Sequence, residues 1–321
     1  MHALPRRTAL LGALAMPFLA RAAAAQSPVT LRLANYKAGD NLLLRLAGQA
    51  EGAPYRAEWA EFGSGNLMVE AVNAGSLDLA YGSEIPPAFA AASGAKIKVV
   101  AVIRGDVNEQ VVLVPKDSPI RTITDLKGKR VGYVRATTTH YYLNRMLGEV
   151  GLSFADIRPV NLTPSDGLAA FRNGALDTWA IYGYSVPVAR QEGARVLRNA
   201  AGILSGNYLF FAAPAALENP GKRAAIAEHL RRVNRAFRWQ DTHVPELAAA
   251  QSALLGVPEP VIRSVLENVS QPRRLTPPDD AAVASHQAVA DEFVRLGLLP
   301  AGVQVAPLWD RSFGGTLELG A

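Results

Sequence analysis

The sequence predicts an α/β protein built from two similar lobes, and three observations indicate this fold class. Between residues 31 and 213, segments with the alternation of β-strands take turns with segments of helical apolar spacing. The pattern Gly-x-Leu-Asp occurs at Gly75 to Asp78 and again, 99 positions later, at Gly174 to Asp177. The chain has 321 residues, of which 49% are hydrophobic, and this is enough to bury the cores of two domains of ordinary size.

The first unit is expected to contain strands, loops and short helices in regular order. Its segments are a strand at 31–35, a polar loop at 36–40, a helix at 42–50 ending at Gly52, a strand at 55–62, the loop Gly63-Ser64-Gly65-Asn66 followed by a helix, a strand at 77–82, a helix at 89–92, and buried strands at 97–103 and 110–114.

The second unit repeats the first at an offset of 99 residues without a gap. It opens with a strand at 130–134, a loop at 135–139 and a helix at 140–149 that ends at Gly151. The matched pairs are Leu33 with Gly132, Asp40 with Thr139, Gly52 with Gly151, Ser64 with Thr163, Gly75 with Gly174, and Asp78 with Asp177. The units of solenoid repeats are only about 20 to 50 residues long, so this offset indicates two lobes.

The remaining segments define the expected domain boundaries. Strands at 110–114 and 208–213 are expected to cross between the lobes, and the helical tail, at 220–241, 245–255, 259–268 and 279–296, to pack on the first lobe. We therefore expect lobe 1 at residues 26–115 plus 213–321 and lobe 2 at residues 116–212.

Residues 1–25 have the pattern of a secretory signal. Arg6 and Arg7 precede an apolar run at 8–20, and the small residues at 22–25 favour cleavage after Ala25. The arginine pair permits the twin-arginine route as well as the Sec route. The alternative, a membrane anchor, is disfavoured because the run falls short of the ~20 residues needed to span a bilayer.

Composition argues against several function classes. The leader holds three of the 33 basic residues and no acid, so the mature chain has 30 basic and 28 acidic residues, and its net charge falls from +5 to +2. This balance does not favour a nucleic-acid partner. Without cysteine, no disulfide and no thiolate metal or redox site can form.

Four polar loops open predicted helices at 37–41, 63–66, 136–140 and 163–166, two in each unit. Helix N-termini at the carboxyl ends of strands present unpaired N–H donors, so facing loops from two lobes are suited to a small anion. The alternative is that their polar residues only cap the helices. Tyr36, Tyr141, Tyr182, Tyr184 and Tyr208 lie at or beside these loops and are candidate aromatic walls, or alternatively amphipathic residues at a core edge.

Signatures of catalysis and of metal binding are weak. The loop around Ser64 lacks the spacing of a nucleophile elbow, and the histidines lack His-Glu-x-x-His spacing, so we expect no catalytic residue, no metal and no cofactor. His140 is a candidate anion donor or a first-turn histidine facing solvent. Glu84 is discordant beside an anion pocket, and it is expected to contact a cationic or hydroxyl group of the ligand or, preferably, to pair with Lys37.

Several segments together resemble a known family. They are Glu70 to Asp78, Pro86 to Ala90, Leu113 to Ile120, Asp125 to Val131, His140-Tyr141 and Gly193 to Leu197. These segments resemble solute-binding proteins of ABC transporters for aliphatic sulfonates, within the broader nitrate, sulfonate and taurine group. The resemblance covers the mature chain to about Asp241.

The resemblance implies a type II periplasmic binding fold, with two lobes, a two-strand hinge and a ligand cleft, and it implies a membrane permease as partner. Transferred position by position, the family's ligand groups are Tyr36, Lys37, Ser64, Ser83, Glu84, Thr138, Thr139, His140 and Tyr182. From the loops and their aromatic residues, Asn41 and Tyr184 join this candidate ligand site.

Two positions depart from the family pattern. Ser83 and Glu84 stand where the family often has Asp, and Gly183 and Tyr184 follow Tyr182 where the family often has Trp followed by Asp. The second departure removes a carboxylate suited to an amino group, which disfavours taurine. We expect a monomeric periplasmic binding protein for a small organic anion, above all an alkane- or arylsulfonate. The alternatives are nitrate, a pyrimidine thiamine precursor, an aromatic carboxylate, a sensor domain, or an enzyme on the same fold.

Overall fold

The computed structural model describes residue 2 and residues 28–318. The expected leader, residues 1–25, lies outside the described residues apart from residue 2, so its cleavage and export route stay predictions. Among the helices of the described part, none is both long enough and apolar enough to cross a membrane.

Six strands form sheet A, in the order β11-β4-β10-β3-β1-β2. Their bounds are β1 Val29–Asn35, β2 Tyr55–Glu61, β3 Leu79–Ser83, β4 Lys98–Arg104, β10 Asn207–Ala212 and β11 Arg274–Thr276. Strand β1 pairs in parallel with β2 and β3, whereas β10 lies antiparallel between β3 and β4. The parallel part of the sheet therefore directs the carboxyl ends of β1, β2 and β3 to one edge.

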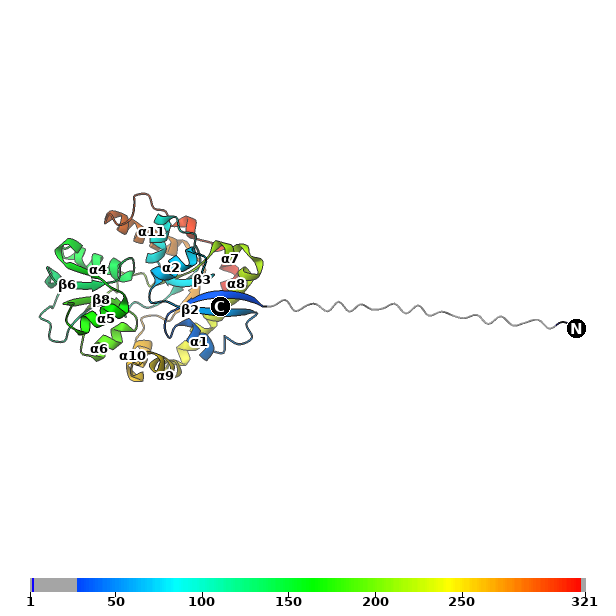
Figure 1. Ribbon diagram of the computed structural model, residues 1–321, viewed down its shortest axis with the longest axis horizontal. Coiled ribbons are helices and arrows are strands. Elements are labelled where there is room, and N and C mark those ends of the chain that lie inside the picture. The colour runs from blue at the N-terminus through cyan, green and yellow to red at the C-terminus, as the bar shows by residue number, and fades with distance from the viewer. Residues whose placement is uncertain (1, 3–27, 319–321) are drawn as a thin grey trace.

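Five strands form sheet B, in the order β7-β6-β8-β5-β9. Their bounds are β5 Gln110–Val114, β6 Arg130–Tyr133, β7 Arg158–Asn161, β8 Thr178–Tyr182 and β9 Arg195–Asn199. Strand β6 pairs in parallel with β7 and β8, and β5 lies antiparallel between β8 and β9. Sheet B thus repeats the plan of sheet A, as the two-lobe prediction expected. Strands β6 and β8 of sheet B lie apart from β2 and β3 of sheet A (Figure 1).

The helices cover both sheets. The α-helices are α1 Asp40–Leu46, α2 Gly65–Asn73, α3 Ile85–Ser93, α4 Thr138–Glu149, α5 Pro164–Arg172, α6 Ser185–Gln191, α7 Pro214–Glu218, α8 Pro220–Thr242, α9 Val244–Leu255, α10 Glu259–Glu267, α11 Asp280–Arg295 and α12 Gly314–Glu318. Short 3₁₀ helices are η1 Ile123–Leu126, η2 Phe154–Asp156, η3 Ala306–Leu308 and η4 Arg311–Phe313. Helix α3 begins at Ile85, four residues before the start of the predicted helix at 89–92. Pro86 and Pro87 fit its first turn because the backbone N–H groups there have no acceptor within the helix.

The chain crosses between the sheets at 105–109 and 200–206, which corrects the expected boundaries. The expected division placed β5 with lobe 1 and β10 with lobe 2, whereas β5 pairs within sheet B and β10 within sheet A. The two connections touch at two glycines, where Gly105 N–H donates to Gly206 O at 3.0 Å. A Cβ at Gly206, whose φ is +77°, would lie 2.4 Å from Gly105 O. We therefore propose lobes of residues 28–104 plus 207–318 and residues 110–199.

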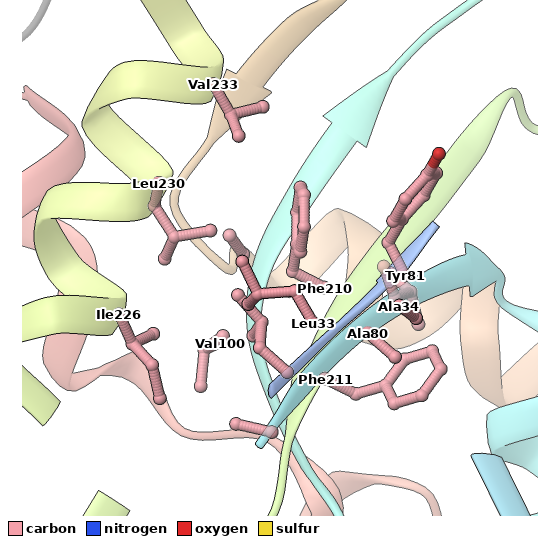
Figure 2. Packing of buried hydrophobic residues seen from close by; sticks show 14 of the residues in the cluster. Leu33, Ala34, Ala80, Tyr81, Val100, Phe210, Phe211, Ile226, Leu230 and Val233 are labelled. Atoms are coloured by element: carbon pink, nitrogen blue, oxygen red, sulfur yellow. The ribbon is translucent and has the colours of Figure 1, made fainter. Parts of the chain in front are cut away.

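The core of sheet A lies against the long helix α8. Ile226, Leu230 and Val233 of this helix face Leu33, Val100 and Phe210 of the sheet (Figure 2). All six side chains are at most 2% exposed. Burying a side chain of this size contributes about 1.5–3 kcal/mol, so this layer fixes the sheet whose edge carries part of the candidate site.

The same kind of ion pair occurs once in each sheet. It links β1 to the turn before β3 in sheet A, and β6 to the turn before β8 in sheet B. Arg32 donates to Asp78 and to Gly75 O, and Arg130 donates in the same way to Asp177 and to Gly174 O. The arginines are 98 positions apart, whereas the glycines and aspartates are 99 apart. The expected gap-free register is therefore wrong by one residue at the first strands, and Leu33 corresponds to Val131 rather than Gly132.

The two ion pairs are expected to differ in strength because they differ in burial. The Asp78 side chain is 2% exposed and is also bound by Lys222, whereas the Asp177 side chain is 31% exposed. Asp78→Asn should lower the free energy of unfolding by about 2–4 kcal/mol, since it removes the buried carboxylate that both Arg32 and Lys222 bind. Asp177→Asn, the matched control, should cost below about 1 kcal/mol. Urea denaturation followed by circular dichroism checks this; equal losses would contradict it.

Candidate functional site

The candidate site lies where the carboxyl ends of strands from both sheets meet the starts of helices. At two of the four predicted loops the helix start is uncommitted, which means that the residue before the helix does not cap it with its side chain. Ser64 precedes α2 and Thr137 precedes α4, and neither side chain caps its helix. Thr163, by contrast, caps α5 by accepting from Asp166 N–H at 3.2 Å, and it is exposed. The capping alternative therefore holds at residues 163–166.

The start of α2 forms one side of the site. Ser64 is 5% exposed, and the N–H groups of residues 65–67 have no acceptor within the helix. Gly65 leaves room for Tyr36, since a Cβ there would lie 3.3 Å from Tyr36 Oη. Asn66 Oδ1 is buried and has no hydrogen-bond partner among the described residues. Hydroxyl, amide and backbone groups therefore converge at this helix start.

The start of α4 forms the opposite side, and its three threonines have different roles. Thr139 is fully buried and turned back to β6, where its Oγ1 donates to Val134 O at 3.0 Å and accepts from Val134 N at 2.8 Å. Thr137 Oγ1 also donates to Val134 O, at 2.8 Å. The hydroxyls of Thr137 and Thr139 are therefore structural, and the contribution of this helix start to a ligand is its free backbone N–H groups.

Thr138 is connected to sheet A through a chain of side-chain hydrogen bonds. Its Oγ1 donates to Gln110 Oε1 at 2.6 Å, and Gln110 Nε2 donates to Tyr208 Oη at 3.0 Å. Gln110 begins β5 of sheet B, and Tyr208 lies on β10 of sheet A. A polar chain therefore spans the two sheets beside the crossing segments.

His140 is neutral in this structure. Its Nδ1 accepts from Ala136 N–H at 3.3 Å, and its ring packs on Tyr133, Phe154 and Phe293. Burial, and secondly the charge of Arg135, lower the pKa of His140 from 6.5 to about 4. The expected alternative of a solvent-facing histidine is therefore wrong, and an anion would not meet an imidazolium at this position above about pH 4.

Tyrosines from both sheets line the region between the helix starts. Burial raises the pKa of Tyr36 well above its ordinary value, and the nearby Tyr182 and Tyr208 raise it further. Burial also raises the pKa of Tyr182, and it raises that of Tyr184 to about 12. These phenols stay protonated, so each can donate a hydrogen bond to an anion. Tyr141 instead packs on Phe293 of α11.

Three further predicted residues are placed near these helix starts with weaker roles. Lys37 is exposed and makes no ion pair within the described residues. Asn41 lies in the first turn of α1 and donates its backbone N–H to Asn35 Oδ1 at 3.2 Å. Ser83 ends β3, and its Oγ accepts weakly from Ile85 N–H at 3.4 Å.

Glu84 does not pair with Lys37, which corrects the preferred expectation. Its carboxylate is 3% exposed and accepts from Ser205 Oγ at 2.7 Å, from Ser285 Oγ at 3.0 Å and from Asn207 Nδ2 at 3.4 Å. Burial raises the pKa of Glu84, and these hydrogen bonds oppose the rise. The carboxylate thus ties the start of α3 to β10 and α11, with its oxygens committed to protein donors.

Asp40, Gln110 and Arg273 lie beside the candidate site, and the sequence does not predict this. Arg273 precedes β11, a strand that was not predicted, and its side chain lies 3.6 Å from Asp40. In the sequence, Gln110 is only the first residue of an apolar strand. Their one sequence signal is polarity at the border of an apolar segment, which is common to many surface residues.

Glu84→Gln should lower the midpoint of thermal unfolding but leave ligand affinity within about threefold, because the partners of Glu84 are protein groups of the sheet A lobe and of the crossing segment at 200–206. Thermal denaturation and titration calorimetry on the same samples check both parts. A loss of affinity beyond tenfold with unchanged stability would show that the carboxylate contacts the ligand after all.

Comparisons with known proteins agree with this architecture. A family model described as "NMT1/THI5 like" matches residues 60–206. The "Putative aliphatic sulfonates-binding protein" of Escherichia coli (strain K12) is 34% identical over 303 residues, which are 93% of this chain and 94% of that protein. The alkanesulfonate-binding protein SsuA from Xanthomonas axonopodis pv. citri, solved bound to MOPS, is 32% identical with a TM-score of 0.82 and covers 90% of this chain and 100% of that one.

The fold is also shared beyond binding proteins. The desulfurization enzyme DSZB has a TM-score of 0.63 at 15% identity, covering 91% of this chain and 98% of that one, a level that shows the fold alone. The identity and coverage of the E. coli relative show more than the fold. The chain has the periplasmic binding protein fold and belongs to the family of aliphatic sulfonate-binding proteins.

Proposed function

We propose that this chain is the periplasmic binding component of an ABC importer and that it captures a small organic anion, an aliphatic sulfonate. The observation that carries the proposal is the pair of uncommitted helix starts, α2 beside sheet A and α4 beside sheet B. Each offers free backbone N–H groups and the positive end of a helix dipole, which together favour an oxyanion. The names of its relatives support the sulfonate as cargo.

Neutral donors suit a sulfonate well. A sulfonate is a monoanion whose three oxygens accept hydrogen bonds, and it needs no proton from the protein. The donors around the helix starts are backbone N–H groups, the hydroxyl of Ser64, and the protonated phenols of Tyr36 and Tyr182. Such donors are stronger in a desolvated cleft than in water.

We propose binding without chemical conversion. None of the hydroxyls of Ser64, Thr138 and Tyr182 is hydrogen bonded to a histidine or a carboxylate among the described residues, as an activated nucleophile would be. The same fold in DSZB keeps the enzyme alternative testable, and conversion of a bound sulfonate would overturn this part of the proposal.

Closure of the two lobes is the proposed binding motion. The crossing segments at 105–109 and 200–206 are the proposed hinge, and a ligand that touches both α2 and α4 favours the closed arrangement because only there are both sets of contacts made. We propose that the monomer in its closed form then docks on a membrane permease.

The function is tested by titration calorimetry of the mature chain with a panel of butanesulfonate, butanoate, benzoate, nitrate, taurine and a pyrimidine thiamine precursor. Butanesulfonate should bind with the highest affinity, and at 100 times its dissociation constant it should add about 2.7 kcal/mol of stability. A panel in which nitrate, a carboxylate or the pyrimidine binds best would replace the sulfonate by that cargo.

A matched pair of glycine variants tests the site. Gly65→Ala should weaken sulfonate binding about tenfold, or about 1.4 kcal/mol, since the new methyl group would press on Tyr36 Oη and Pro86 at the helix start. Gly63→Ala, two residues earlier, meets no atom within 4 Å and should bind as the parent does. Equal affinities for both variants would place the ligand elsewhere.

The neutrality of His140 predicts an affinity that is independent of pH. The pKa of about 4 keeps the imidazole uncharged from pH 5.5 to 8, and a sulfonate stays ionised throughout. Butanesulfonate affinity should therefore change by less than about twofold over this range. A progressive gain on acidification that disappears in His140→Gln would show an imidazolium contact and contradict the assignment.

A further inference from the structure

Arg273 is a cation in the region between the lobes whose guanidinium donates no hydrogen bond to a protein group among residues 28–318. Its guanidinium stacks on Phe237, with Cζ 4.1 Å from the ring centroid, and its side chain is 33% exposed. The one ion pair found for it within residues 28–318 is to Asp40, with Nη2 and Oδ1 3.6 Å apart, which is longer than a direct hydrogen bond. Several N–H donors of the fork are therefore available to an acceptor.

Arg273 is placed to meet a ligand held between the lobes. The aliphatic part of its side chain passes the crossing segments. A Cβ added to Gly105 would lie 3.8 Å from Arg273 Cγ. Its charge lowers the pKa of Tyr208 on sheet A and of Tyr184 beside sheet B, while burial raises both. Tyr184 itself packs with Val257 and Ile262 of the sheet A lobe. The guanidinium thus lies among groups from both lobes.

Asp40 holds this cation in place. Its side chain is 3% exposed, and neither carboxylate oxygen has a hydrogen-bond partner among the described residues. A buried carboxylate without a compensating cation is costly, so Asp40 keeps Arg273 in the cleft instead of letting it extend into solvent. Because Asp40 is almost inaccessible, a ligand meets the open side of the guanidinium and not the carboxylate.

We propose that Arg273, positioned by Asp40, is a second ligand subsite, and that the preferred cargo is a sulfonate carrying a carboxylate at its other end. This inference rests on the proposed function, in which the helix starts hold the sulfonate. A planar fork with free N–H groups matches a carboxylate in two-point contact, a geometry that lysine cannot reproduce. Arg273 then binds the carboxylate end of the ligand, and the carbon chain between the two ends lies along the tyrosines.

The test compares matched ligands in titration calorimetry with the mature chain. Ethane-, propane- and butanesulfonate are each paired with the sulfocarboxylate of the same carbon number, sulfoacetate, 3-sulfopropanoate and 4-sulfobutanoate. At least one sulfocarboxylate should bind tenfold or more tightly than its plain partner. If the plain sulfonates bind and no sulfocarboxylate exceeds its partner, the second subsite is overturned and the proposed function stands. If neither series binds, the proposed function itself fails.

Variants test which residue causes the tighter binding of the sulfocarboxylates. Arg273→Gln should abolish the advantage of the sulfocarboxylate while leaving plain sulfonate affinity within about threefold, and Arg273→Lys should recover only a minor part. Arg274→Gln is the matched control, because the neighbouring arginine pairs with Asp241 and makes no contact with Asp40. A parallel loss for both ligand classes in Arg273→Gln would mean that Arg273 holds the sulfonate, and would overturn the proposal.

Asp40 is tested as a positioning residue. Asp40→Asn should reduce the sulfocarboxylate-to-sulfonate affinity ratio while plain sulfonates bind as before; an unchanged ratio would overturn this role. Since Arg273→Gln leaves Asp40 buried without its cation, it is measured alongside the double variant Asp40→Asn/Arg273→Gln, which removes both charges. A double variant that keeps the full tenfold preference would overturn the subsite.

Discussion

The structure depends on an exchange between two similar sheets, in which each sheet contains one strand that follows a strand of the other sheet in the chain. Strand β5 follows β4 in the chain but pairs within sheet B, and β10 follows β9 but pairs within sheet A. Each of these strands lies inside its sheet, antiparallel to both neighbours, so neither can leave without breaking two ladders. The short connections that result meet at Gly105 and Gly206, and a side chain at Gly206 would collide with the backbone of Gly105. This constraint keeps the edges of the two sheets that carry the candidate site next to one another.

These edges determine the chemistry of the candidate site. The helix starts supply neutral donors, and the buried tyrosines and His140 carry no charge at neutral pH. Formal charge enters through Arg273 and Asp40, which lie close together, and through Lys37 in solvent. An anion therefore gains hydrogen bonds and helix-dipole attraction with modest repulsion from the protein. Glu84, although next to Ser83, is compensated by the hydroxyls of Ser205 in the crossing segment and of Ser285 in α11.

Features fixed by local backbone geometry were predictable from the sequence. Gly75 and Gly174 both have positive φ, near +75°, and both precede the aspartate that binds the strand arginine. Features fixed by tertiary contacts were not. The one-residue shift between Arg32 and Arg130 became visible only through their partners. The partners of Glu84 lie more than 120 residues away, and those of Arg273 more than 30, so no local pattern reports them.

The central claim is that a sulfonate is bound between the starts of α2 and α4, and a crystal structure of the mature chain with butanesulfonate tests it most directly. The account predicts sulfonate oxygens within hydrogen-bonding distance of the backbone N–H groups of residues 65–67 on one side and of Thr138 and Thr139 on the other, with Tyr36 and Tyr182 against the ligand. A sulfonate bound outside the cleft, or one held by a single lobe with the other helix start empty, would contradict it.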